Sequence, residues 1–213
     1  MSTLKEWLHW LKPEVLIAWG GLTGLIAIVF AETGLMIGFV LPGDSLLFTA
    51  GLFASTGRFK VDITVLNVSL MAAAIVGDAV GFWTGAKAGK HLFRREDSRF
   101  FKKQHLLRAK AFYEKHGAKT IVLARFVPII RTFAPMVAGA AEMKYRTFVI
   151  YNVLGAIGWV GSMTVSGYVL GRSFPWIGEH IHWVALGIIA VSFIPVAIEV
   201  QRARREAAEE KKE

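Results

Sequence analysis

Residues 120–140 read TIVLARFVPIIRTFAPMVAGA, an apolar run that carries two arginines and two prolines. Its length alone suits a membrane crossing, because about 20 apolar residues span the hydrocarbon core as a helix. Pro128 and Pro135 interrupt such a helix, since proline lacks the backbone N–H, and Val127 is displaced toward extended backbone by the proline that follows it. The sequence therefore predicts a broken segment and not a plain crossing.

The charges on both flanks of this run agree with a turn inside the membrane. Residues 87–119 before it hold eleven Lys or Arg against three acids, and Lys144 and Arg146 follow it. Positive residues mark cytoplasmic loops, so both ends of the run face the cytoplasm. Non-helical backbone at membrane depth is tolerated only where protein buries it or where it lines a cavity. The run is predicted to be a re-entrant hairpin that contributes to a site.

The composition of the whole chain also places it in a membrane. Hydrophobic residues make up 54% of the 213 positions and the mean hydropathy is +0.46, which is too high for a soluble domain. The absence of cysteine excludes disulfides, thiolate metal sites and cysteine nucleophiles. The first segment carries Glu6 and no small-residue cleavage site, so we expect it to be retained and not removed as a signal peptide.

The remaining apolar runs are assigned by length and flanking charge. Residues 16–54 are too long for one span and are predicted to form a crossing of roughly 18 residues followed by a hairpin that enters from outside. The breaker of that hairpin is LPGDS at residues 41–45, where Pro and Gly favour a turn and Asp or Ser suits a helix cap. Three single crossings are expected at residues 61–86, 148–170 and 183–200. Arginines after the last one mark a cytoplasmic C-terminus.

The predicted fold is an all-α polytopic membrane protein with about four transmembrane helices, two opposed re-entrant hairpins and an N-terminal interfacial helix. Residues 1–14 form the amphipathic interfacial helix, 15–200 a single membrane domain and 201–213 a charged cytoplasmic tail. The hairpins lie near 32–54 and 120–140, and the basic cytoplasmic loop is 87–119. A stripe of small residues for close helix packing is formed by Gly77, Gly81, Gly85 and Gly89.

Four ionisable residues lie in these apolar stretches, at Glu32, Asp44, Arg125 and Arg131. A charge at the bilayer centre costs roughly 2.5 to 3.5 kcal/mol on insertion scales, so each needs a partner, a cavity or a function. The break at Pro128 allows both arginines to point into one cavity, and guanidinium is well suited to phosphate.

The two carboxylates have two interpretations. In the first, Glu32 and Asp44 only neutralise the arginines as buried pairs. In the second, they exchange protons when a phosphate displaces one of them from an arginine. A third acid, Asp78, is interpreted mainly as a partner of an arginine, with direct participation or an interfacial position as alternatives.

Several motifs together resemble a known family. They are ETG at 32–34, PGD at 42–44, GD at 77–78 with GFW at 81–83, and RFVPIIRT at 125–132. This combination resembles the bacterial DedA family, also called the SNARE-associated or VTT-domain family, over roughly residues 15–200. The resemblance implies an inner-membrane protein with two opposed hairpins, needed for membrane homeostasis and resistance that depends on the proton-motive force. Its acidic pair matches Glu32 and Asp44, and its arginine pair matches Arg125 and Arg131.

The leading hypothesis is a proton-coupled translocase of a phosphate-bearing lipid, undecaprenyl phosphate or a phospholipid. Arginines hold the phosphate and carboxylates couple protons. The alternative is a proton-driven exchanger of small molecules or cations in which the arginines are structural, and a membrane scaffold without transport also stays open. No enzyme activity, metal site or cofactor is expected. Expected partners are the lipid, protons, and anionic lipid headgroups at the basic loop, but not nucleic acid; the sequence does not give the oligomeric state.

Overall fold

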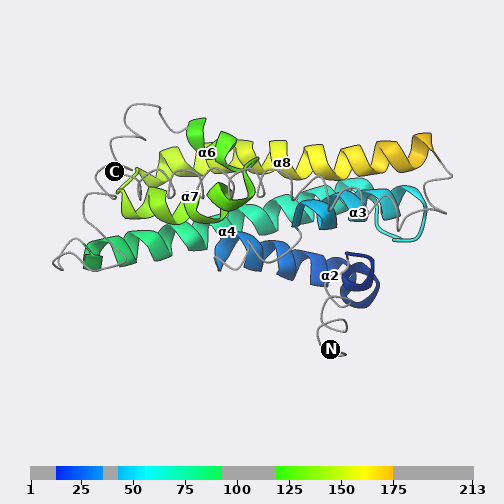
Figure 1. Ribbon diagram of the computed structural model, residues 1–213, viewed down its shortest axis with the longest axis horizontal. Helices are drawn as coiled ribbons and strands as arrows, with labels where there is room; N and C mark the ends of the chain where they lie inside the picture. The colour runs from blue at the N-terminus through cyan, green and yellow to red at the C-terminus, as the bar shows by residue number, and fades with distance from the viewer. Residues whose placement is uncertain (1–12, 36–42, 93–118, 175–213) are drawn as a thin grey trace, which may run out of the picture.

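The computed structural model describes residues 13–35, 43–92 and 119–174, and every regular element in these ranges is a helix. The helices are α2 (Pro13–Gly34), α3 (Gly43–Ser55), α4 (Ile63–Leu92), α6 (Lys119–Ala124), α7 (Pro128–Ala140) and α8 (Tyr145–Ser173), as labelled in Figure 1. Three stretches are long and apolar enough to cross a membrane: Val15–Gly34, Ile63–Ala88 and Tyr145–Ser173. The fourth predicted crossing at 183–200, the interfacial helix at 1–14 and the tail at 201–213 lie almost entirely outside the described residues.

The two long helices α4 and α8 run side by side and form the frame of the molecule (Figure 1). Polar side chains join them within their apolar surroundings. The hydroxyl of Thr164 donates to Oδ1 of Asn67 at 2.7 Å, and Nδ2 of Asn152 donates to the carbonyl of Ile75 at 3.1 Å. Hydrogen bonds between helices of this kind fix the register of helices that share an apolar environment.

The short helices α3 and α7 lie toward opposite ends of this frame (Figure 1). Each has 13 residues, about 20 Å at 1.5 Å per residue, which is well short of the roughly 30 Å hydrocarbon core. Helix α3 packs on α8 and α7 packs on α4. Glycines permit both contacts, since a Cβ added at Gly51 would meet the backbone of Thr164 and one at Gly85 the backbone of Met136. The predicted glycine stripe of α4 is therefore a packing surface.

Helix α2 contains the first predicted crossing, and it is not straight. It bends at Gly21, whose φ of 55° and ψ of −152° suit a residue without a side chain. Its C-terminal end lies beside the middle of α4, where a Cβ on Gly34 would stand 3.0 Å from the carbonyl oxygen of Gly77. Helices α2 and α3 lie next to each other. The residues that connect them, 36–42, are outside the described ranges.

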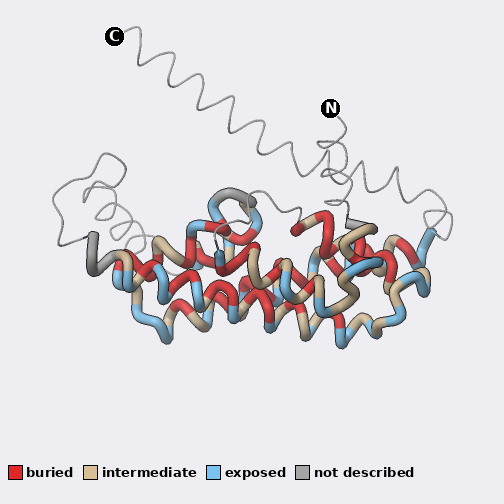
Figure 2. Tube along the Cα trace, turned by 90° about the horizontal axis from the view of Figure 1, so that it is seen from below, coloured by how far each residue is buried: buried red, intermediate tan, exposed pale blue. Residues whose placement is uncertain are grey.

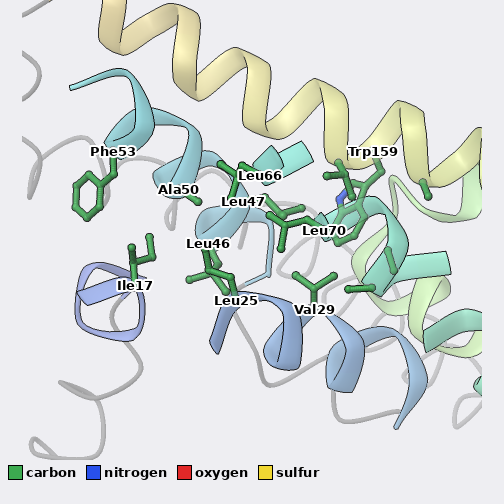
Figure 3. Packing of buried hydrophobic residues seen from close by; sticks show 14 of the residues in the cluster. Ile17, Leu25, Val29, Leu46, Leu47, Ala50, Phe53, Leu66, Leu70 and Trp159 are labelled. Carbon is green, nitrogen blue, oxygen red and sulfur yellow. The ribbon is translucent and has the colours of Figure 1, made fainter. Parts of the chain in front are cut away.

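Apolar side chains hold α2, α3, α4 and α8 together. Figure 3 shows Ile17 of α2 on the side of Phe53 and Leu25 close to Leu46, so α2 and α3 run in opposite directions. Trp159 of α8 belongs to the same buried cluster. Buried positions follow the lines where helices meet, and exposed positions face outward (Figure 2). Large apolar side chains such as Trp19, Val68 and Leu123 are among the exposed ones, which suits a protein whose solvent is lipid.

Two predicted boundaries need correction. Within residues 120–140 the helix breaks only at 125–127, and Pro135 lies inside α7 without ending it. Helix α4 continues to Leu92, six residues past the predicted end of the crossing and into the predicted basic loop. Long basic side chains at the end of a crossing are tolerated because their charged ends reach the headgroup region. Residues 93–118 of that loop lie outside the described ranges.

Candidate functional site

Arg131 lies in the first turn of α7, directly after the break in residues 120–140. Val127 precedes the helix in extended conformation, with φ −113° and ψ 108°, and Pro128 occupies the first helical position. Proline suits that position because the first N–H groups of a helix have no intrahelical acceptor. The backbone N–H of Arg131 donates to the carbonyl of Val127 at 2.9 Å. The break therefore sets the direction of the arginine side chain.

The guanidinium of Arg131 joins two carboxylates from two other helices. Its Nη2 is paired with Oε1 of Glu32 at the end of α2, and its Nη1 with Oδ1 of Asp44 in α3 at 2.5 Å. Trp159 of α8 covers the group, with its ring centre 4.5 Å from Cζ of Arg131. The indole Nε1–H donates to the same Oδ1 of Asp44 at 2.7 Å. Four helices thus meet at one cation.

The carboxylate of Glu32 also lies against the start of α3. A Cβ added at Gly43 would collide with the carboxylate oxygens of Glu32, so a larger residue there would displace that carboxylate. The N-terminus of a helix carries a partial positive charge, which stabilises a nearby carboxylate. Asp44 lies in the same first turn. The start of α3 therefore holds both acids that face Arg131.

Arg125 forms a second cluster at the break itself. Its Nη2 is paired with Oδ2 of Asp78 in α4 and with Oδ1 of Asn152 in α8. The side chain is buried, and Gly155 of α8 makes the space, since a Cβ there would stand 2.7 Å from Cδ of Arg125. This cluster attaches the break to both frame helices. Of the three interpretations of Asp78, the structure has it as the partner of an arginine.

The five charged groups do not balance. Three carboxylates, Glu32, Asp44 and Asp78, face Arg125 and Arg131, so the fully ionised site carries one net negative charge. Exposure differs as well, because 20% of the Asp44 side chain is exposed against 1% for Glu32. Asp44 therefore lies nearest the outside. Among the described residues no group of three or more His, Cys, Asp or Glu is placed to hold a metal ion.

Sequence reasoning missed two residues of the site. Asn152 is an amide in a predicted crossing, and a polar residue at that depth is a signal for an interhelical partner. Trp159 has no such signal, because a tryptophan in an apolar segment is unremarkable. The structure gives each arginine its own carboxylate partners, and the prediction that both face one cavity stays a prediction.

Comparison with known proteins shows the family of the chain. The VTT domain matches residues 41–169, more than half of the chain. The chain belongs to the DedA family of VTT-domain proteins. Protein DedA of Escherichia coli (strain K12) is 47% identical over 184 residues, which cover 86% of this chain and 84% of that protein. The VTT match includes Asp44, Asp78, Arg125 and Arg131 and begins after Glu32.

Mycobacterial relatives of this DedA-family chain extend the match. An uncharacterized membrane protein of Mycobacterium leprae (strain TN) is 42% identical over 191 residues, 90% of this chain and 84% of that protein. One of Mycobacterium tuberculosis (strain ATCC 25618 / H37Rv) is 40% identical over 210 residues, 97% and 92% of the two chains. No solved structure matches. Together with the three apolar helices, these relatives identify the chain as a membrane protein.

Proposed function

We propose that this DedA-family protein is a proton-coupled translocase of a phosphate-bearing lipid in the bacterial inner membrane. The observation that carries the proposal is Arg131, a buried cation at a helix break that is held by carboxylates from two other segments. Arginine binds phosphate through parallel charge-assisted hydrogen bonds, as it binds carboxylate. A phosphate headgroup can therefore take the place of a carboxylate. Undecaprenyl phosphate and phospholipids both carry that group.

The two broken segments supply a route across the membrane. The predicted hairpins at 32–54 and 120–140, which include α3 and α7, act as re-entrant segments that open to opposite sides and meet at Arg131. Transporters built from opposed broken helices bind substrate near the midplane in this way. The headgroup enters from one side, binds at Arg131 and leaves to the other side as the opposite hairpin opens. The C-terminus is cytoplasmic in this arrangement, as the terminal arginines indicate.

Proton coupling follows from the net charge of the site. The ionised site already carries one net negative charge, and a phosphate adds at least one more. An unpaired charge is costly in a low-dielectric interior, so arrival of the phosphate favours uptake of a proton by a displaced carboxylate. Glu32 and Asp44 are the proposed carriers. Arg125, bound to Asp78 and Asn152, adds the second positive charge that attracts the phosphate.

The predicted basic loop at residues 87–119 gives the protein a second proposed partner. Residues 87–119 carry eleven basic and three acidic residues. Juxtamembrane basic segments are attracted to anionic headgroups by about 1 kcal/mol per Lys or Arg. We expect this segment to concentrate anionic lipid at the cytoplasmic surface, next to the entry of the second hairpin.

Transport in proteoliposomes tests the proposal. The purified protein is reconstituted with a fluorescent short-chain lipid phosphate, and a membrane-impermeant quencher reports how fast the probe changes leaflet. Arg131→Ala and Arg131→Lys are expected to abolish movement of the probe while the protein elutes as a folded species from size-exclusion chromatography. Unchanged probe movement in both variants would eliminate the assignment.

A second function, a proton-driven cation exchanger, is favoured by one observation. The ionised site has one more carboxylate than it has arginines, which suits a bound cation as well as a proton. In that case a cation gradient moves protons in lipid vesicles that contain no lipid phosphate. A pH-sensitive dye inside the vesicles separates the two functions, because the translocase moves protons only when the lipid phosphate is present.

A further inference from the structure

The three nitrogens of the Arg131 guanidinium have different partners. Nη1 donates to Asp44, Nη2 donates to Glu32, and Nε has no hydrogen-bond partner among the described residues although it is buried. In a guanidinium, Nε–H and one Nη2–H point in the same direction and form one edge. A carboxylate or phosphate that binds this edge takes two parallel hydrogen bonds. Glu32 therefore occupies only half of the edge that it faces.

The two carboxylates are also held with different strength. Oδ1 of Asp44 accepts from Arg131 at 2.5 Å and from the Trp159 indole at 2.7 Å. Glu32 uses Oε1 for Arg131, while its Oε2 is buried without a hydrogen-bond partner among the described groups. Charge-assisted hydrogen bonds are the stronger class, so the additional indole bond fixes Asp44 more firmly. Glu32 is the carboxylate that a competing anion displaces more easily.

We propose that Trp159 and Asp44 together position Arg131, and that the lipid phosphate binds the Nε–Nη2 edge and displaces Glu32 alone. This inference rests on the proposed translocase function and assigns different roles to its two acids. Asp44 stays on Nη1 throughout. Trp159 covers one face of the guanidinium, so the phosphate approaches in the plane of the group. Glu32, released from Nη2, takes the proton.

The surroundings of Glu32 are consistent with this division of roles. The charged groups that act on it are Arg131 from α7 and Asp44 from α3. Helix α4 also packs on α2, but its acid, Asp78, is paired with Arg125. Once a phosphate holds the edge of Arg131, the charged side chain that remains beside Glu32 among the described residues is another acid, Asp44. The loss of its cation and the neighbouring negative charge both favour the neutral form of Glu32.

Variants of the three residues separate these roles in the proteoliposome assay. Trp159→Phe keeps a ring over Arg131 but removes the N–H, so the KM for the probe is expected to rise about tenfold, as for loss of one hydrogen bond to a charged group, with the maximal rate within about twofold. Asp44→Asn is expected to raise KM as well and to keep the pH dependence of transport. Glu32→Gln is expected to transport with a flat pH profile.

The matched control is Trp83→Phe, because Trp83 lies in α4, is 57% exposed and has its ring contacts with Phe82 and Tyr145. It is expected to match the wild type in KM, rate and pH profile. If Trp159→Phe behaves like this control, or if pH dependence is lost in Asp44→Asn and kept in Glu32→Gln, the inference is overturned while the translocase function stands. A wild-type protein that moves no probe overturns the proposed function and this inference with it.

Discussion

The buried pair between Arg125 and Asp78 gives a stability prediction that does not depend on the transported substrate. Only 5% and 4% of the two side chains are exposed, so solvent screens neither charge. Asp78→Asn leaves the guanidinium without its counter-charge. Removing one partner of a buried pair typically costs about 3–5 kcal/mol, and for a chain of this length each kcal/mol lowers Tm by about 2–4 °C. We therefore expect Tm to fall by about 6–20 °C.

Thermal unfolding in detergent, followed by tryptophan fluorescence, measures this loss. The comparison variant is the double substitution Asp78→Leu with Arg125→Met, because replacing both members of a buried pair by apolar residues often leaves stability unchanged. We expect the double variant to recover most of the stability and still to transport poorly, since it lacks the second cation. A single Asp78→Asn variant within 1 °C of the wild type would refute the assignment of this pair as a buried anchor.

Three further predictions follow from the packing and capping of the helices. Gly43→Ala places a methyl group where the Glu32 carboxylate lies, so transport is expected to fall sharply in proteoliposomes while the protein remains folded; normal transport would contradict the contact. Gly85→Ala brings a methyl group against the backbone of α7 and should destabilise the protein by about 1–3 kcal/mol. Gly24→Ala is the control, because a Cβ there has nothing within 4 Å, and it should leave Tm unchanged. Equal effects of the two substitutions would show that the glycine stripe of α4 does not pack closely. The backbone N–H of Thr64 donates to the Asp62 carboxylate and lowers its pKa, so this cap stabilises α4 above the unfolded pKa of about 3.9 and the stabilisation is lost as pH falls through the folded pKa. The Tm of Asp62→Ala should therefore lie below that of the wild type at pH 7 and equal it in acid. A Tm difference that stays constant with pH would contradict this.

The membrane class and the helix break could be predicted from the sequence because both depend on local composition. Pro128 in an apolar run decides where α7 begins, whatever the rest of the chain does. The glycine stripe of α4 predicted a close contact for the same local reason. Glu32, Asp44, Arg125 and Arg131 are conspicuous because charge is costly in lipid.

The pairing of these charges could not be predicted, because it depends on how separate helices are placed. Periodicity does not indicate that Arg125 turns to Asp78 and Asn152 while Arg131 turns to Glu32 and Asp44. The bend at Gly21 depends on a backbone angle that glycine permits but does not require. The sequence therefore predicts a crossing here but not the bend of α2, whose end reaches the middle of α4.

The central claim is that Arg131 exchanges a carboxylate for a lipid phosphate. Solid-state NMR of the reconstituted protein, with carbon-13 in its arginine Cζ atoms and natural phosphorus-31 in the lipid, measures that contact as dephasing of the carbon signal by phosphorus. Arginines of the basic segment also meet headgroups, so the account predicts dephasing in the wild type with a lipid phosphate and a measurable decrease of it in Arg131→Lys. Absence of dephasing in the wild type, or dephasing that persists unchanged in Arg131→Lys, would contradict it.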